Sequence, residues 1–194
     1  MCNLYRLERN PDAIRRLFAD ADIPLDFPEG IPNIAPTDVH ITDRAPIVRR
    51  AGSGAELVVR RWSWPNTGGK PLYNLKSEGR TFGERRCLAV ADGFYEYTAP
   101  ADPKAKRKDR WLFRPAEGEL IGIAALWRDH PEVGEAFTLL TAEPGEDVRP
   151  FHHRQIVLIP PQRWADWLTP AVPSRDLLVP TPPGFLRVDA APTP

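Results

Sequence analysis

Residues 85–97 read RRCLAVADGFYEY, the stretch of this 194-residue chain whose pattern says most about the fold. It is rich in apolar and aromatic residues, which predicts a strand over Arg86–Tyr97. Further segments share this composition: Ala45–Arg50, Glu56–Trp64, Arg110–Arg114, Leu120–Trp127, Ala136–Ala142 and Gln155–Ile159. Because the connections between them are short and long helices are missing, the chain does not show the alternation of a parallel doubly wound sheet. We expect an α+β fold, a single compact β-rich domain with a mostly antiparallel, barrel-like sheet and a few short helices.

Two short helices are indicated outside the predicted strands. Asn10 can cap the first helix, Pro11 suits its first turn, and the apolar residues that follow lie on one face. This helix should run to about Asp20. A second short helix is expected at Gln162–Leu168, where two tryptophans and a leucine have the spacing of a core-facing side.

The C-terminal segment, residues 170–194, holds seven prolines in 25 residues. Edge strands are expected there only at Leu177–Val179 and Phe185–Val188. Residues 23–36 carry four prolines and should form a loop. We therefore expect one domain over residues 1–194, with its core in about residues 2–168.

Composition narrows the class of protein. Hydrophobic residues make up 42% of the chain, and no apolar run approaches the ~20 residues that span a bilayer. The sequence opens without a secretory signal and has two cysteines, Cys2 and Cys87, so a reducing cytoplasm is the expected location. Neither cysteine has a Cys or His partner at zinc-finger spacing, so we expect no metal and no cofactor. A monomer without a membrane partner is expected, and Cys87 is interpreted as a small core residue.

Charge is segregated along the chain although the net charge is zero. The region from Arg44 to Arg110 holds 15 Lys/Arg against 7 Asp/Glu, and the remainder has the opposite imbalance. Such segregation can give a neutral protein one electropositive face that attracts a phosphate backbone, unless folding mixes the charges again. Residues 98–110 (TAPADPKAKRKDR) are interpreted as a basic hairpin loop, either solvated surface or a finger that contacts phosphate.

The N-terminus begins Met1-Cys2-Asn3. A small residue at position 2 favours removal of the initiator methionine, which would leave Cys2 with a free thiol and a free α-amine. An α-amine titrates near ~8, so part of it is uncharged at neutral pH and can form a Schiff base with an aldehyde. The thiol can then close onto the imine as a five-membered ring. The alternative is that Cys2 is simply a small residue in an N-terminal strand.

Three other segments have more specific polar patterns than a plain β domain needs. Residues 32–37 read PNIAPT, a rigid turn with a polar tip, residues 73–78 read YNLKSE, and residues 151–155 read FHHRQ. His152 and His153 are adjacent, so in an extended chain their side chains should point to opposite faces. At most one of them should therefore lie in a site, and we expect His153 at the surface.

Taken in order, these motifs resemble the SRAP (SOS response-associated peptidase) family over roughly residues 2–168. The resemblance rests on the N-terminal Met-Cys, the Asn-Ile-Ala-Pro-Thr turn, Asn-x-x-Ser-Glu, Arg-Arg-Cys-Leu followed by Asp-Gly-Phe-Tyr-Glu-Tyr, and His-x-Arg before the last core strand. It implies a β-rich α+β domain with a positively charged cleft for single-stranded DNA. It also implies that the N-terminal cysteine forms a thiazolidine crosslink with abasic sites, which shields the lesion from strand breakage.

The resemblance implies a role for each of four residues. Cys2 matches the nucleophilic cysteine, and Asn74 matches an asparagine that positions the cysteine and the sugar. Glu96 matches a general acid/base, and His152 matches a histidine that assists ring opening. These residue types suit the chemistry, because an imidazole moves protons near neutral pH and a carboxyl with a raised pKa can supply the proton that expels water. Alternatively, Glu96 simply faces water on the polar side of its strand.

Residues predicted to contact DNA are Lys76, Arg154, Trp64, Trp62, Pro36 and Thr141. By resemblance, Lys76 and Arg154 sit where the family contacts phosphate. Trp62 and Trp64 occupy alternate positions of one predicted strand, so they should face the same side. There they form either a core pair or a wall on which bases stack.

Three functions from different classes remain open at this point. The leading hypothesis is a DNA-damage protein that binds single-stranded DNA and forms a covalent adduct at abasic sites through Cys2. The second is a cysteine peptidase or amidohydrolase, including self-processing at the N-terminus, with Cys2 as nucleophile and His152 or the α-amine as base. The third is a module that binds nucleic acid reversibly, without chemistry. The chain departs from the family pattern at Leu4, Lys76 and Gln155, and Lys76 keeps the charge of an arginine without its bidentate geometry.

Overall fold

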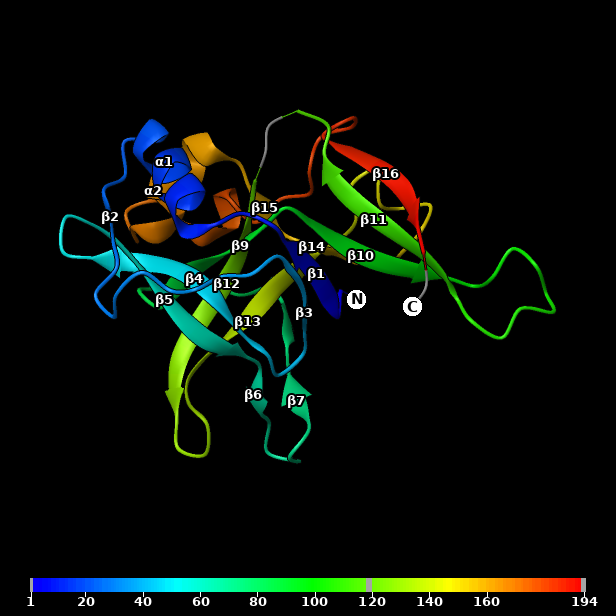
Figure 1. Cartoon of the computed structure of the whole chain (residues 1–194), viewed down its shortest axis with the longest axis horizontal. Helices are drawn as coiled ribbons and strands as arrows, with labels where there is room; N and C mark the ends of the chain where they lie inside the picture. The colour runs from blue at the N-terminus through cyan, green and yellow to red at the C-terminus, as the bar shows by residue number, and fades with distance from the viewer. Residues whose placement is uncertain (1, 118–119, 193–194) are drawn as a thin grey trace.

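The computed structural model describes residues 2–117 and 120–192 and contains a closed barrel of five strands at its centre (Figure 1). The barrel order is β13-β12-β9-β4-β5, and β5 pairs back with β13 at Trp62 and Phe137, which closes the ring. This closing pair is parallel, whereas the other four pairs are antiparallel. The barrel strands are β4 (Arg44–Ala51), β5 (Gly54–Trp62), β9 (Arg86–Ala91), β12 (Ile121–His130) and β13 (Gly134–Ala142). The expectation of a mostly antiparallel, barrel-like α+β fold is confirmed.

A second sheet has the strand order β16-β11-β10-β1-β3 and is antiparallel throughout. Its strands are β1 (Leu4–Leu7), β3 (Thr37–His40), β10 (Gly93–Thr98), β11 (Asp109–Pro115) and β16 (Leu186–Ala191). The edge strand predicted at Phe185–Val188 corresponds to β16. The edge strand predicted at Leu177–Val179 is wrong, because a 3₁₀ turn, η2 (Ser174–Asp176), precedes it and the Leu177 N–H donates back to the Ser174 carbonyl at 3.0 Å.

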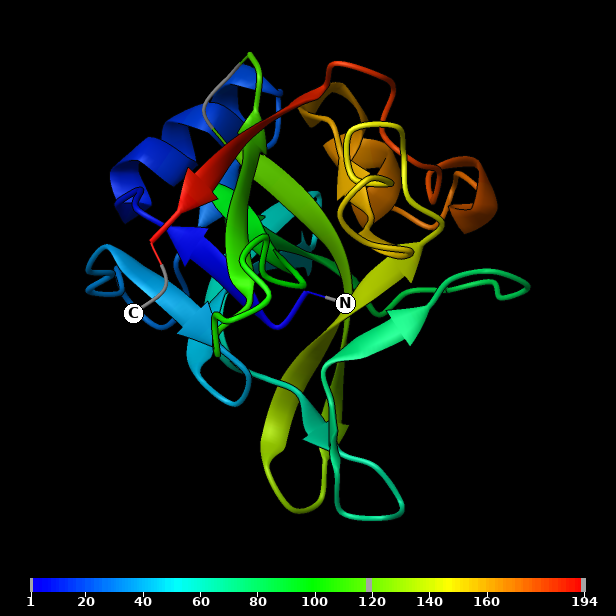
Figure 2. The same cartoon turned by 90° about the vertical axis from the view of Figure 1, so that its right-hand side faces the viewer.

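Short strands join the barrel sheet or, for β6 and β7, form a separate two-stranded sheet. They are β2 (Leu25–Asp26), β6 (Trp64–Pro65), β7 (Pro71–Leu72), β8 (Asn74–Lys76), β14 (Gln155–Ile156) and β15 (Leu158–Ile159). β2 lies within the predicted loop at residues 23–36, and the predicted strand Gln155–Ile159 is divided because β14 pairs with β13 whereas β15 pairs with β12. The β6–β7 hairpin projects beside the β12–β13 hairpin at one end of the molecule (Figure 2).

Two helices lie side by side at another end of the molecule (Figure 1). The first, α1 (Pro11–Asp20), begins as predicted, because the Asn10 side chain accepts a hydrogen bond from the Ala13 N–H at 2.9 Å. A 3₁₀ turn, η1 (Pro161–Arg163), leads into the second helix, α2 (Trp164–Leu168). Phe18 of α1 stacks on Trp164 of α2 with a distance of 4.4 Å between ring centroids, which joins the helices.

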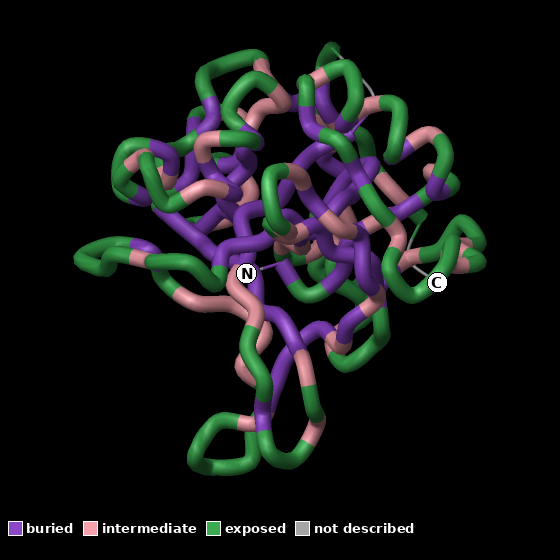
Figure 3. The backbone as a smooth tube through the Cα atoms, turned by 90° about the vertical axis from the view of Figure 1, so that its left-hand side faces the viewer, coloured by how far each residue is buried: buried purple, intermediate pink, exposed green. Residues whose placement is uncertain are grey.

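Buried residues concentrate along the barrel strands and β10, and exposed residues concentrate in the connecting loops (Figure 3). Tyr5, Trp62 and Phe137 are fully buried, and Tyr5 packs against Trp62 with ring centroids 5.1 Å apart. Cys87 is also fully buried, which confirms that it is a core residue. Each large apolar side chain buried in this way contributes about 1.5–3 kcal/mol to folding. The N-terminal strand is therefore anchored in the core by an aromatic side chain.

The predicted strand Arg86–Tyr97 is two strands in different sheets, so its prediction as one element is wrong. β9 ends at Ala91, and Asp92 bends the chain before β10 begins. The Asp92 carboxylate accepts hydrogen bonds from the Glu8 N–H at 2.5 Å and from the Arg9 N–H and side chain, while the Asp92 N–H donates to the Arg6 carbonyl. These bonds redirect the chain from the barrel to the second sheet.

The predicted strand Glu56–Trp64 is also interrupted. Ser63 has a φ of 86°, in the left-handed region that is uncommon for residues other than glycine, and its N–H donates to the Phe137 carbonyl at 2.7 Å. Trp62 therefore ends β5 and Trp64 begins β6. The prediction that the two tryptophans lie on one regular strand is wrong.

β10 and β11 lie close together at Gly93, where a side chain has no room. A Cβ atom at residue 93 would lie 2.6 Å from the Phe113 carbonyl oxygen, a backbone atom. We expect Gly93→Ala to lower the free energy of unfolding by about 1–3 kcal/mol in urea denaturation, because the strands must separate. Gly83→Ala is the control, since a Cβ there meets nothing within 4 Å, and it should cause no loss. Equal losses in the two variants would contradict this steric explanation.

Candidate functional site

Cys2 lies at the junction of the second sheet and the barrel. It lies two residues before the start of β1, in which Tyr5 pairs with Phe94 of β10. Cys2 is 1% exposed, and its thiol donates a hydrogen bond to the Leu4 carbonyl at 3.3 Å. The Asn74 amide of β8 donates to the Cys2 carbonyl at 2.7 Å. Because β8 runs parallel to β13, the barrel presents Asn74 to the backbone of Cys2.

Glu96 is buried on β10 rather than facing water. It is 1% exposed and shares a strand face with Phe94, whose ring stacks on Phe113 in the core. Tyr95, on the opposite face, packs with Leu4. Burial raises the pKa of Glu96 to about 7, so the carboxyl can exchange a proton at neutral pH.

His152 completes the group. Its Nε2 lies 4.0 Å from Oε2 of Glu96. Its Nδ1 accepts a hydrogen bond from the Arg154 N–H at 3.0 Å and lies equally close to the Arg154 carbonyl oxygen. In the neutral tautomer in which Nδ1 accepts, the ring hydrogen is on Nε2, the nitrogen nearer Glu96. Burial lowers the pKa of His152, and the nearby charges of His153 and Lys108 lower it further.

The two adjacent histidines do not point to opposite faces as predicted. Their rings stack with centroids 4.4 Å apart. The extended geometry assumed for this segment is absent because the His152 N–H donates to the Val148 carbonyl in a turn, and β14 starts only at Gln155. His153 is exposed, as expected.

The Cys2 thiol is uncharged at neutral pH. Burial raises its pKa, and the nearby Glu96 carboxylate raises it further. The environment of Cys2 therefore does not supply a ready thiolate, and the thiol depends on a neighbouring base to lose its proton.

Sequence reasoning gave the two tryptophans a DNA-stacking role that their burial opposes. Trp62 is fully buried, and its indole N–H donates to the Tyr73 carbonyl at 2.9 Å. Trp64 is 7% exposed, and the Arg128 guanidinium lies 5.5 Å from its ring centroid. In this structure both rings pack against protein instead of forming an open wall for bases.

The other predicted DNA contacts divide into exposed and buried residues. Lys76 and Pro36 are exposed, whereas Thr141 is 1% and Arg154 9% exposed. The Arg154 guanidinium binds the Glu78 carboxylate with two hydrogen bonds, of 2.5 and 2.9 Å, and also binds Thr141. In this arrangement Arg154 is held by protein groups, so it does not present an open phosphate contact.

One residue of the basic loop between β10 and β11 was not predicted at the site. Lys108 is close enough to His152 to lower the pKa of the imidazole. Arg110, on β11, packs instead on the face of β10 opposite Glu96, with its guanidinium 4.3 Å from the Tyr95 ring centroid and 3.8 Å from the Asp38 carboxylate. The concentration of Lys and Arg in residues 98–110 was the sequence signal for Lys108, but the sequence does not tell which of these residues folds back.

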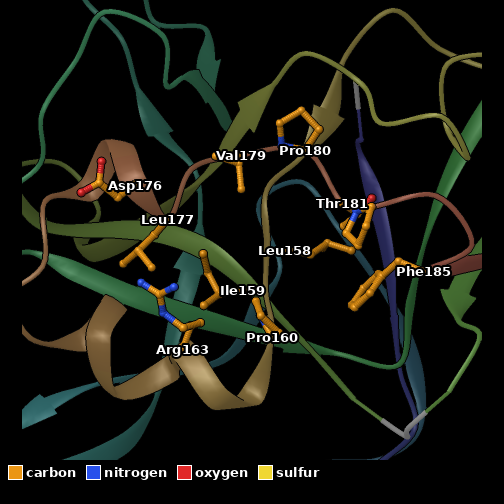
Figure 4. A pocket seen from close by; sticks show the side chains of 11 residues that line it. Leu158, Ile159, Pro160, Arg163, Asp176, Leu177, Val179, Pro180, Thr181 and Phe185 are labelled. Atoms are coloured by element: carbon orange, nitrogen blue, oxygen red, sulfur yellow. The ribbon is translucent and has the colours of Figure 1, made fainter.

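A separate apolar hollow of about 250 Å³ lies beside β15 and the proline-rich C-terminal segment (Figure 4). Leu158, Leu177, Val179 and Phe185 are among its lining residues, and none of the predicted site residues lines it.

Within residues 2–117 and 120–192, no three His, Cys, Asp or Glu side chains are grouped so that they could hold a metal ion. No helix in the same ranges is long and apolar enough to cross a membrane.

The fold and the site define a barrel-based α+β domain with a buried N-terminal cysteine beside a carboxyl and an imidazole. A family model described as SOS response associated peptidase (SRAP) matches residues 1–188. The chain belongs to this family. A search of curated protein sequences found no match.

Solved structures share the fold at low sequence identity. A protein from Bordetella bronchiseptica is 23% identical, with a TM-score of 0.76 over 99% of this chain and 100% of that chain. A phage-related protein from the same organism is 18% identical, with a TM-score of 0.74 over 99% and 95% of the two chains. A protein from Bacteroides thetaiotaomicron is 15% identical, with a TM-score of 0.73 over 97% and 91%. These likenesses support the fold.

Burial of Glu96 should make folding stability depend on pH. Because its folded pKa is raised from 4.5 to about 7, the unfolded state loses this proton first, and stability falls as pH rises from 4.5 to 7. We expect Glu96→Gln to gain roughly 3 kcal/mol relative to the wild type across this window in urea denaturation. Glu29→Gln is the control with the opposite sign, since Arg60 lowers the Glu29 pKa. A pH-independent difference between Glu96→Gln and the wild type would contradict the burial argument.

Proposed function

We propose that this protein binds abasic sites in single-stranded DNA and, once the initiator methionine is removed, captures them through Cys2 as a covalent thiazolidine. The observation that carries the proposal is the convergence of Cys2, Asn74, Glu96 and His152 from four separate parts of the chain. Membership of the SRAP family supports a role in the SOS response. The crosslink would shield the lesion from strand breakage.

Ring opening comes first, because the aldehyde of an abasic sugar is masked as a cyclic hemiacetal. The hydroxyl at the anomeric carbon must lose a proton, and the ring oxygen must gain one. His152 is uncharged at neutral pH because its pKa is lowered, so its imidazole can take the first proton. Glu96, with a pKa of about 7, is partly protonated and can deliver the second. Each such group typically accelerates a reaction by ~10²–10⁴-fold.

Capture then needs both functions of Cys2. Ring opening leaves Glu96 as a carboxylate and His152 as an imidazolium. The α-amine attacks the aldehyde carbon, Glu96 takes a proton from the nitrogen, and His152 gives its proton to the oxygen. Glu96 then returns its proton to the hydroxyl, which leaves as water, and a protonated imine remains. The thiol proton passes to the Glu96 carboxylate, the sulfur attacks the imine carbon, and a carbon–sulfur bond forms. One water is released overall. The Asn74 amide, fixed on the Cys2 carbonyl at 2.7 Å, holds the cysteine backbone during these steps.

The protonated state of the Cys2 thiol favours aldehyde capture, in which the amine attacks first, over peptidase chemistry. An acyl nucleophile needs a thiolate or a base bound to the thiol, whereas the Cys2 thiol has a raised pKa and donates to the Leu4 carbonyl. In aldehyde capture the amine attacks first, and the thiol loses its proton only when the imine is already in place. The site therefore supports the covalent DNA crosslink better than amide hydrolysis.

The DNA strand is proposed to approach across Lys76 and the basic loop at residues 98–110. Lys76 is exposed on β8, two residues after Asn74, and Lys108 lies near His152. Both positions bring a positive charge to the candidate site, where phosphate groups flanking the lesion would pass. We propose that the protein acts as a monomer.

Covalent capture is tested with an abasic single-stranded oligonucleotide and a denaturing gel. The wild type should give a heat-stable adduct, and Cys2→Ala should give none because it lacks the sulfur that closes the ring. Cys87→Ala is the matched control, since Cys87 is equally buried and also has a raised pKa, and it should retain the adduct. Intact mass should show that residue 1 is absent from reactive protein. A heat-stable adduct from Cys2→Ala would refute the role of Cys2.

The rate of adduct formation at saturating DNA should have a maximum near neutral pH. Below it the α-amine, which titrates near ~8, is charged, and above pH 7 Glu96 loses the proton that it donates. Glu96→Gln should slow the reaction by ~10²–10⁴-fold and remove the alkaline decline. A decline that persists unchanged in Glu96→Gln would show that another group supplies the proton.

A further inference from the structure

A polar cluster lies next to His152, on the Nδ1 side of its ring, and links three segments of the chain. Glu78 follows β8, Thr141 belongs to β13, and Arg154 directly precedes β14. Glu78 accepts hydrogen bonds from both terminal nitrogens of the Arg154 guanidinium, at 2.5 and 2.9 Å. Nη2 of the same guanidinium also donates to the Thr141 carbonyl at 2.8 Å and to its hydroxyl at 3.0 Å. Paired charged hydrogen bonds of this kind are directional and strong.

The Thr141 carbonyl is the common point of the cluster. It accepts hydrogen bonds from the N–H of Ser77 at 2.9 Å and from its hydroxyl at 3.0 Å, in addition to Arg154. The segment that carries Asn74 and the segment that carries His152 are therefore fastened to the same residue of the barrel. Their separation across the site depends on this attachment.

The backbone of Arg154 connects the cluster to the imidazole. Its N–H donates to Nδ1 of His152, and its carbonyl oxygen lies at the same 3.0 Å from this atom. The opposite ring nitrogen, Nε2, faces Glu96 at 4.0 Å. The Arg154 main chain thus holds the Nδ1 side of the ring and directs Nε2 toward Glu96.

We propose that Glu78 is a positioning residue for covalent capture, because its bidentate contact with Arg154 holds the main chain that aims His152 at Glu96. The inference rests on the function proposed above. Arg154 as a whole is 9% exposed, and its guanidinium donates to Glu78 and Thr141. Arg154 therefore acts on the site through these two attachments. The alternative is that Arg154 leaves Glu78 to bind a DNA phosphate, in which case Glu78 competes with DNA.

Glu78→Gln separates these two roles. The substitution keeps the shape and removes the charge and one acceptor, and the Glu78 side chain is 44% exposed, so the fold should tolerate it. The adduct rate at saturating abasic DNA should fall by about 10–100-fold, as expected for a misaimed proton-transfer group. Binding of an oligonucleotide with a tetrahydrofuran abasic analogue, which has no aldehyde, should change less than two-fold. Unchanged chemistry, or analogue binding several-fold tighter than in the wild type, would overturn the proposal.

Glu29→Gln is the matched control. Glu29 makes the corresponding two hydrogen bonds, of 2.7 and 3.0 Å, to Arg60, which is 8% exposed, and neither residue contacts the candidate site. It should leave adduct formation within two-fold of the wild type. Thr141→Val is a second test variant, since it removes the hydroxyl acceptor of Arg154 at nearly constant volume, and it should slow the reaction in the same direction.

Nitrogen NMR of the His152 ring gives a readout that needs no DNA. The charged or titratable groups near the ring include the N-terminal amine, Glu96, His153, Lys108 and Arg154. In Glu78→Gln, loosening of the Arg154 main chain should change the populations of the two neutral tautomers, which the chemical shifts of Nδ1 and Nε2 report. Removing a negative charge alone would move the titration midpoint without changing these populations, and unchanged populations would overturn the proposal. A wild type without any adduct would refute the proposed function, while this measurement would still decide the role of Glu78.

Discussion

The carboxylate of Asp92 fixes the point where the chain leaves the barrel and enters the second sheet. It binds the backbone N–H groups of Glu8 and Arg9, so the segment that follows β1 is tied to the start of β10. This attachment sets β1 antiparallel to β10, with Arg6 opposite Gly93. The register then carries the N-terminus along β10 toward Glu96. Cys2 and Glu96 therefore meet at one end of the β1–β10 pair because Asp92 fixes the pair at its other end.

Local patterns in the sequence were sufficient to predict most helices and strands, but not the positions at which two predicted strands are interrupted. Asn10 predicted the start of α1 because capping is a local interaction, and the apolar segments predicted most of the barrel strands. The bend at Asp92 depends on residues more than eighty positions earlier, and the break at Ser63 depends on the Phe137 carbonyl. No local pattern contains these partners.

The candidate site shows the same division. Family motifs selected Cys2, Asn74, Glu96 and His152, and the structure brings these residues into one neighbourhood. The raised pKa values of Glu96 and Cys2 come mainly from burial, which no motif encodes. The same burial explains why Arg154, which the motif suggested for phosphate, is bound to a carboxylate instead.

Closure of the barrel by the parallel β5–β13 pair joins residues 61–62 to residues 136–137, far apart in the chain. During synthesis the N-terminal segment leaves the ribosome first, while β13 and His152 follow more than 130 residues later. A nascent chain therefore carries its cysteine unassembled until most of the polypeptide exists. The Cys2 thiol of an incomplete molecule is not yet buried, so the rise of its pKa through desolvation occurs only when the barrel has closed.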